Sequence, residues 1–115
     1  MVNKPLENGW VWVDSNDRVA QVCEEITSQG VVAVDTEFRR RDTFFPQIAL
    51  MQLATTGHCW LLDPLVISDV APIRQLLLSP NVVKVLHSAS EDLEVFAHWL
   101  GVTPERWVDT QKAAA

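Results

Sequence analysis

The chain has 115 residues, of which 48% are hydrophobic, so it can build one compact core but is too short for two independent domains. Fifteen acidic residues against nine Lys and Arg give a formal net charge of −6, which argues against a protein that coats nucleic acid through a general surplus of positive charge. An acidic balance is still compatible with a nuclease, because carboxylates that hold divalent cations let an acidic cleft accept phosphate.

The cysteines and the amino terminus indicate where the protein works. Cys23 and Cys59 are far apart and form no C-x-x-C pattern, so neither a disulfide framework nor a zinc knuckle is expected, and a reducing cytoplasm fits best. Residues 1–5 contain no apolar signal sequence, and no apolar run approaches the roughly 18 residues that a membrane helix needs. We therefore expect a soluble, cytoplasmic protein with no membrane partner.

The first third of the chain predicts a strand, a helix and a second strand. Residues 10–13 form a β-branched and aromatic run typical of a strand, and Asp14 or Ser15 is positioned to cap the helix that follows. The helix should end at Gly30, and its buried stripe should consist of Val19, Val22, Ile26 and the unreactive thiol of Cys23. Residues 31–34 are continuously apolar, as in a strand covered on both faces, and lead directly into an acidic segment.

The middle of the chain predicts a hairpin and a second helix. Residues 46–55 and 58–62 are two apolar runs separated by a Thr-Thr-Gly turn. A helix is expected to be capped by Ser68 or Asp69, with a proline tolerated in its first turn, and to end at Pro80.

The last third predicts a buried strand at residues 82–86, a helix that stops at Gly101, and a short strand at residues 107–109. Taken in order, these elements predict an α/β fold with a mixed β-sheet flanked by helices. Residues 112–115 have good helix propensity and no cap, which favours a chain that stops inside a helix.

Asp35 and Glu37 are the first candidates for chemistry. They are two positions apart on a strand, so the period of two places both carboxylates on one face, while Thr36 points the other way. Two adjacent anions repel each other and need a cation or a basic partner, and Mg²⁺ or Mn²⁺ meets that need with oxygen ligands. The spacing equally allows the pair to begin a surface loop and to bind the basic residues Arg39–Arg41.

Asp92 is a third candidate acid. It lies in the first turn of the helix that follows the other buried strand, so its carboxylate could project from the same rim of the sheet as the strand-end pair. Taken alone, Asp92 is explained better by the helix dipole, which it would complement together with Glu91. Only the combination of the three acids favours a catalytic site.

Six segments resemble, in chain order, the signatures of the ribonuclease D family. They are Val34–Phe38, Phe45–Gln47, Met51–Leu53, Leu61–Leu65, Leu86–Phe96 and Val108–Gln111. The resemblance covers nearly the whole chain, and it implies a ribonuclease-H-like exonuclease fold with four shared acidic residues. It also implies that Asp35 and Glu37 form the first acidic motif and that Asp92 belongs to the second.

The family's third motif is a Tyr or His followed four positions later by the fourth acid. The chain has no tyrosine, and His87 with Glu91 is the only histidine with an acid at that spacing, next to the Asp92 that the resemblance assigns to the second motif. The family's helical RNA-binding module is also missing from the sequence. Residues 1–115 are therefore expected to be the N-terminal portion of an exonuclease domain, truncated before its last helices and inactive alone.

The resemblance implies that the complete protein is a hydrolase, a 3′-to-5′ exoribonuclease that shortens RNA with a free 3′ end, with tRNA precursors as the substrate class. The three acids would hold two Mg²⁺ or Mn²⁺ ions, with Asp35 bridging both and Glu37 also orienting the terminal 3′ hydroxyl. The helix acid would hold the second ion, partly through water. Thr36, Phe38 and His87 are expected to contact the substrate.

Several alternatives stay open on the sequence. His87 could equally pack or cap at the strand end, and Phe44 and Phe45 fit the core better than they fit stacking on a splayed base. A DNA 3′-to-5′ exonuclease would use the same acids, and a noncatalytic interaction module could share the fold. The presence of all three acids argues against the noncatalytic module.

Overall fold

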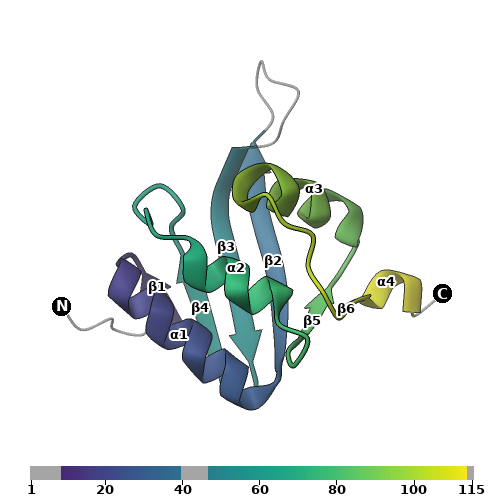
Figure 1. The fold of residues 1–115 in the computed structure, drawn as a ribbon, viewed down its shortest axis with the longest axis horizontal. Coiled ribbons are helices and arrows are strands. Elements are labelled where there is room, and N and C mark those ends of the chain that lie inside the picture. The colour runs from purple at the N-terminus through teal and green to yellow at the C-terminus, as the bar shows by residue number, and fades with distance from the viewer. Residues whose placement is uncertain (1–8, 40–46, 114–115) are drawn as a thin grey trace.

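Figure 1 shows the computed structural model of the chain, which describes residues 9–39 and 47–113. The strands are β1 (Trp10–Val13), β2 (Val31–Arg39), β3 (Gln47–Thr55), β4 (His58–Leu62), β5 (Val83–Leu86) and β6 (Trp107–Asp109). The helices are α1 (Asn16–Gln29), α2 (Ala71–Leu78), α3 (Ala89–Leu100) and α4 (Thr110–Ala113). The order of the elements confirms the predicted order, including the helix at the end.

The strands form one six-stranded sheet in the order β1-β4-β3-β2-β5-β6. β3 runs antiparallel to both β2 and β4, while the other neighbouring pairs are parallel, so the sheet is mixed as predicted. β2 is an interior strand, and its acidic residues therefore lie well inside the sheet and away from its two edges.

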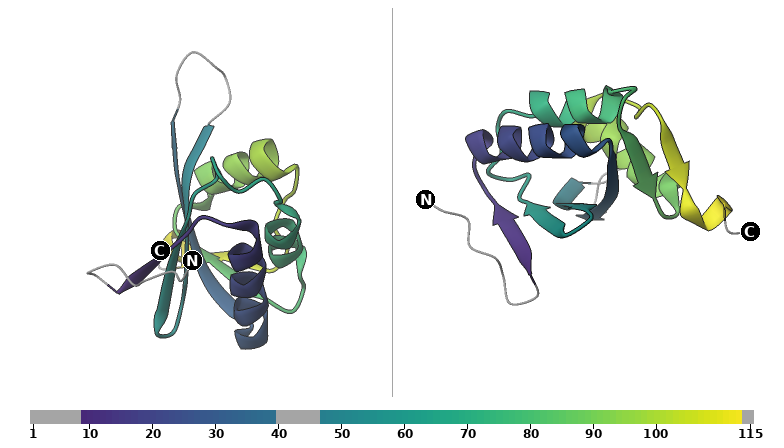
Figure 2. Two further views of the ribbon diagram at one scale, coloured as in Figure 1. Left: turned by 90° about the vertical axis from the view of Figure 1, so that its left-hand side faces the viewer. Right: turned by 90° about the horizontal axis from the view of Figure 1, so that it is seen from below.

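Helices α1, α2 and α3 all lie on one side of the sheet (Figure 2). Burial therefore alternates along β2, where Val32 and Val34 are 1% and 3% exposed but Val31 is 43% exposed. The prediction that residues 31–34 are covered on both faces was wrong for the described part of the chain, because the helices there cover only one face. We call the uncovered side the open face.

The open face extends across several strands, because paired residues in neighbouring strands point to the same side of the sheet. One row of paired residues runs from β1 to β2 and consists of Trp12, Leu61, Gln52 and Asp35. Trp12 is 36% exposed, and the apolar Val108 of β6 is 46% exposed. The open face therefore combines apolar surface with the acidic centre of β2.

The ends of the helices follow local chemistry. The Ser15 hydroxyl accepts a bond from the backbone N–H of Arg18, and Gly30 adopts φ 81° where α1 ends, as the sequence predicts. Helix α2 begins at Ala71, slightly later than predicted, although the Asp69 carboxylate still accepts a bond from the Ala71 N–H at 3.1 Å. No helix within the described ranges is long and apolar enough to cross a membrane.

Lys84 of β5 is a charged residue inside the packed layer, with 0% of its surface exposed. Its Nζ donates to the carbonyl oxygens of Ser79 and Glu105 at 2.6 and 2.9 Å. Burial lowers the pKa of Lys84, because the charged ammonium loses its hydration. Through these two bonds, Lys84 connects β5 to the loop after α2 and to the loop after α3.

Candidate active site

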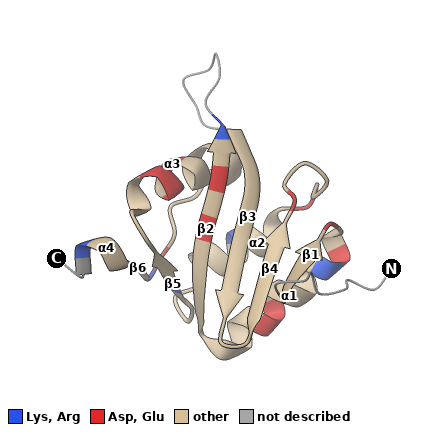
Figure 3. Ribbon diagram, turned by 180° about the vertical axis from the view of Figure 1, so that it is seen from behind, with Lys and Arg blue, Asp and Glu red and all other residues tan. Residues whose placement is uncertain are grey.

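Asp35 and Glu37 lie next to each other along the open face of β2. Both side chains are exposed, whereas Thr36 between them is 5% exposed on the side that the helices cover, which confirms the predicted alternation. Figure 3 shows both acidic positions on β2 as they are seen from the open side. β2 continues to Arg39, so the two acids belong to the strand and do not begin a loop.

The pairing of β2 with β3 changes register between Glu37 and Phe38, directly after the acid pair. Such irregularities bend a strand and change the direction of its side chains, and they are common beside active sites. Phe38 is half-buried at this point. Arg40 and Arg41, which the sequence offers as surface partners for the acids, lie outside the described residues, as do Phe44 and Phe45.

Asp92 lies behind the acid pair, on the helix-covered side of β2. It is in the first turn of α3, is 4% exposed, and accepts a hydrogen bond from the Thr36 hydroxyl at 2.5 Å. Burial raises the pKa of Asp92, the hydrogen bond from Thr36 opposes this, and the nearby negative charge of Asp35 raises it further. A cation close to both carboxylates would relieve the cost of keeping Asp92 ionised.

Three adjacent residues of β2 thus link the three predicted acids: two of these residues are acids themselves, and the third is bonded to Asp92. Asp35 and Glu37 face the open side, and Thr36 between them contacts Asp92 on the other side. Within residues 9–39 and 47–113, however, no three His, Cys, Asp or Glu side chains converge closely enough to hold a metal ion by themselves.

Asp109 at the end of β6 supports the start of α3, a role that the sequence did not assign to it. Its Oδ1 accepts from the backbone N–H of Ser88 and of Gln111 at 3.0 and 2.9 Å, and its Oδ2 accepts from the N–H of Ala89 at 2.9 Å. These bonds, above all the one from Ala89, lower the pKa of Asp109. Ser88 makes no side-chain cap for α3, so Asp109 caps this helix from a neighbouring strand.

His87 follows β5 and is exposed on the open side, so it does not pack into the core. Its Nδ1 is 2.9 Å from the hydroxyl of Thr110, and that hydroxyl also lies 3.2 Å from the carbonyl oxygen of Leu86. His87, Thr110 and Asp35 line a common hollow of about 430 Å³, which is also lined by Ala33, Val34, Gln52, Ala54, Val85 and Leu86. The structure therefore brings His87 and the first acid to one cavity.

The predicted substrate contacts of Thr36 and Phe38 stay predictions. The Thr36 hydroxyl is engaged with Asp92 on the covered side of the sheet, so the structure gives it a part in holding that carboxylate. Neither the Thr36–Asp92 bond nor the Asp109 cap is visible in the sequence, since the partners are 56 and about 20 positions apart. The only hint of the Asp109 cap in the sequence was an aspartate at the end of the predicted strand 107–109, where an acid can cap a neighbouring helix.

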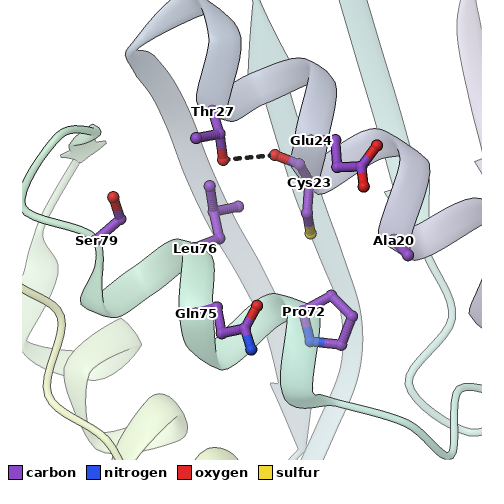
Figure 4. Close-up of a pocket in the computed structure, with 8 residues that line it drawn as sticks. All are labelled: Ala20, Cys23, Glu24, Thr27, Pro72, Gln75, Leu76 and Ser79. Atoms are coloured by element: carbon purple, nitrogen blue, oxygen red, sulfur yellow. Dashed lines mark hydrogen bonds between the residues drawn. The ribbon is translucent and has the colours of Figure 1, made fainter.

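A second hollow, of about 420 Å³, lies between α1 and α2 (Figure 4). Cys23 forms part of its wall but is only 6% exposed, and burial raises the pKa of its thiol to about 12. The prediction that Cys23 is a core residue is confirmed, and its low reactivity stays a prediction. None of the three predicted acids lines this hollow, so it is separate from the candidate site.

The arrangement of sheet, acid pair and helix acid defines a class, that of the ribonuclease-H-like exonucleases. The family model described as 3′-5′ exonuclease matches residues 10–115, and the chain belongs to this family. Ribonuclease D of Pseudomonas paraeruginosa is 47% identical over 104 residues, which are 90% of this chain and 28% of that protein. Ribonuclease D of Escherichia coli strain K12 is 42% identical over 103 residues, with the same coverage of 90% and 28%.

Solved structures agree with the sequence relatives. The crystal structure of Escherichia coli RNase D, described as an exoribonuclease involved in structured RNA processing, aligns with a TM-score of 0.88 at 40% identity and covers 92% of this chain and 28% of that one. Trypanosoma brucei RNase D in complex with RNA U12 shares the fold, with a TM-score of 0.78 at 24% identity over 87% of this chain and 37% of that one. The resemblance to ribonuclease D and the predicted fold are confirmed. The chain spans 28% of the length of each of these two ribonuclease D relatives.

Proposed function

We propose that a complete enzyme containing this chain is a 3′-to-5′ exoribonuclease, for which residues 1–115 form the N-terminal portion of the exonuclease domain. The observation that carries the proposal is the exposed pair Asp35 and Glu37 on β2, with Asp92 held directly behind it by Thr36. This placement occurs in a chain that is 47% identical to a ribonuclease D.

The three acids fit a divalent metal site. Carboxylate oxygens are the ligands that Mg²⁺ and Mn²⁺ prefer, and the raised pKa of Asp92 beside Asp35 indicates a place where a bound cation would favour ionisation. Two metal ions, when bound, would stabilise the attacking and leaving oxygens of an in-line displacement. Asp35 and Glu37 would hold the metal ions on the open face, and Glu37 would also orient the terminal 3′ hydroxyl of the substrate. Asp92 would add a negative charge to the site from the covered side of β2.

RNA is the proposed substrate, with the 3′ ends of tRNA precursors as the finer proposal. Support comes from the names of the relatives, which are ribonucleases, and from the RNA bound by the Trypanosoma brucei protein of the same fold. The fourth acid, the group that activates water, and most of the basic RNA-binding surface are proposed to lie outside the 115 residues. The enzyme is proposed to act in the cytoplasm.

Oligonucleotides of one sequence test the choice of substrate. We expect the complete enzyme, supplied with Mg²⁺ or Mn²⁺, to shorten 3′-hydroxyl RNA one nucleotide at a time and to act more slowly on the matching DNA. Gel analysis of the time course measures both rates. A preference for DNA would support the alternative of a DNA exonuclease, and no shortening of either substrate would support a noncatalytic module.

A further inference from the structure

Three consecutive residues, the last of β6 and the first two of α4, contact the turn between β5 and α3. Asp109 accepts bonds from the N–H groups of Ser88 and Ala89, and Gln111 accepts a bond from the hydroxyl of Ser88. Thr110, between Asp109 and Gln111, contacts His87. This segment forms a clamp that sets the position of the turn from which His87 projects.

The Thr110 hydroxyl has two neighbours but only one hydrogen. Its oxygen is 3.2 Å from the carbonyl oxygen of Leu86, which can only accept, and 2.9 Å from Nδ1 of His87. When the hydroxyl donates to Leu86, it must accept from His87, so Nδ1 carries the proton. In neutral imidazole only one nitrogen is protonated, and Nε2 then presents a lone pair.

We propose that Thr110 is a positioning residue that fixes His87 as the Nδ1–H tautomer, with Nε2 as a hydrogen-bond acceptor at the hollow that Asp35 also lines. Within the described part of the chain, Nε2 has no hydrogen-bond partner. An unprotonated nitrogen recognises a donor, so the matching chemistry in a terminal nucleotide is a ribose hydroxyl or a base amino group, and not a phosphate oxygen. This inference deepens the proposed function and rests on it for the identity of the ligand.

The tautomer can be measured without activity. We expect long-range ¹H–¹⁵N spectra of the 115-residue chain, recorded at about pH 8 where an ordinary histidine is neutral, to show a protonated Nδ1 and an unprotonated Nε2 in His87. Thr110→Ser should keep this pattern, whereas Thr110→Val, which has the same shape without a hydroxyl, should move the proton to Nε2. His58 and His98 provide internal controls in the same spectra. Backbone amide spectra show whether each variant is folded.

Two spectral results would overturn the assignment. One is a parent chain in which His87 already carries its proton on Nε2, and this result decides even if the valine variant does not fold. The other is a folded Thr110→Val variant whose His87 pattern does not change. Either would mean that the hydroxyl donates to Nδ1 or has no effect on the ring.

Kinetics of the complete enzyme test the role. Loss of one neutral hydrogen bond predicts that Thr110→Val raises KM for RNA about 2- to 10-fold with a smaller change in kcat, and that Thr110→Ser restores KM. If the ribose 2′ hydroxyl is the donor, the effect of the valine should vanish on RNA with a 2′-deoxy terminal residue. If the 3′ hydroxyl or a base amino group is the donor, the effect should persist there, and a terminal uridine, which has no base amino group, separates these two. A fall in kcat with KM unchanged would contradict the role. An enzyme without nuclease activity would refute the proposed function and leave the tautomer measurement standing.

Discussion

Thr36 and Asp92 show how a single residue connects the two faces of the sheet. Thr36 follows Asp35 in the strand, so its side chain points to the covered side, where its hydroxyl meets the buried Asp92. The backbone of β2 and this single bond therefore connect Asp35 to Asp92. The bond couples an exposed acid of the candidate site to a buried one.

The raised pKa of Asp92 predicts a change in stability. The folded pKa of Asp92 lies above its unfolded pKa, so ionisation of Asp92 destabilises the folded state at pH values above the folded pKa. This destabilisation is relieved as the pH falls through the folded pKa towards the unfolded pKa. Asp92→Asn removes the buried charge but still accepts the bond from Thr36. We therefore expect a higher Tm than the parent at pH 7 in the absence of divalent metal, and a smaller difference near pH 4. A lower Tm at pH 7 would show that the ionised carboxylate stabilises the fold.

At this scale the sequence predicts what depends on neighbours in the chain. The period of two along a strand was sufficient to place Asp35 and Glu37 on one face and Thr36 on the other. The bond between Thr36 and Asp92 and the cap that Asp109 provides depend on how strands and helices assemble, so local patterns do not reveal either partner. The same holds for the contact between His87 and Thr110.

The turn from β5 to α3 is held by an element that comes later in the chain. Ser88 adopts φ 59°, in the left-handed region, and the two N–H groups at this point are satisfied by the carboxylate of Asp109 at the end of β6. Because β5 and β6 are parallel neighbours, the end of β6 lies beside the start of α3. The position of Asp92 in the first turn of α3 depends on this cap.

Asp109 predicts a pH dependence of the opposite sign. Its folded pKa is lowered by the backbone bonds, so its contribution to stability is present above the unfolded pKa, near 3.8, and is lost as the pH falls through the lower, folded pKa. Asp109→Asn should therefore lower the Tm at pH 7, and the difference from the parent should shrink below about pH 4. Thermal unfolding followed by circular dichroism measures both. An unchanged Tm at pH 7 would refute the capping role.

Patterns in the sequence predict the elements better than their limits. Hydrophobic periodicity gave the order of strands and helices, and Ser15 and Gly30 bound α1 as predicted. The start of α2 differs because the loop before it is shaped by Asn16, which accepts bonds from the N–H groups of Ser68 and Asp69. A contact between segments 52 positions apart decides that boundary.

The whole molecule has helices on one side of its sheet and an open face on the other (Figure 2). A continuous apolar run predicted cover on both faces of residues 31–34, yet Val31 is 43% exposed. The hydrophobicity of a segment shows which of its residues favour burial, but not whether another segment of the chain covers them. The three acids were likewise recognised from the sequence, but within residues 9–39 and 47–113 no three His, Cys, Asp or Glu side chains converge closely enough to hold a metal ion by themselves.

We expect the 115-residue chain alone to be inactive or nearly so. If the fourth carboxylate and the water-activating group lie outside these residues, as we propose, the site should bind Mg²⁺ weakly, and loss of a water-activating group typically costs 10² to 10⁴ in rate. The net charge of −6 would also weaken the encounter with RNA. Incubation of the purified chain with 3′-hydroxyl RNA and millimolar Mn²⁺, beside its Asp35→Asn variant as a control for contaminating nuclease, measures this. Stepwise shortening by the parent chain only would show that three acids suffice.

The most direct test of the catalytic role of these acids is the turnover of the complete enzyme after the substitution Asp35→Asn. The change keeps the size of the side chain and removes one of the two charges of the acid pair. We therefore expect Mg²⁺-dependent removal of nucleotides from RNA to fall at least about a hundredfold, while the Tm stays the same. Glu24→Gln is the matched control, because it removes an exposed carboxylate from α1, away from the site, and should leave turnover unchanged. Turnover near the parent value in folded Asp35→Asn enzyme would contradict the assignment of these acids to catalysis.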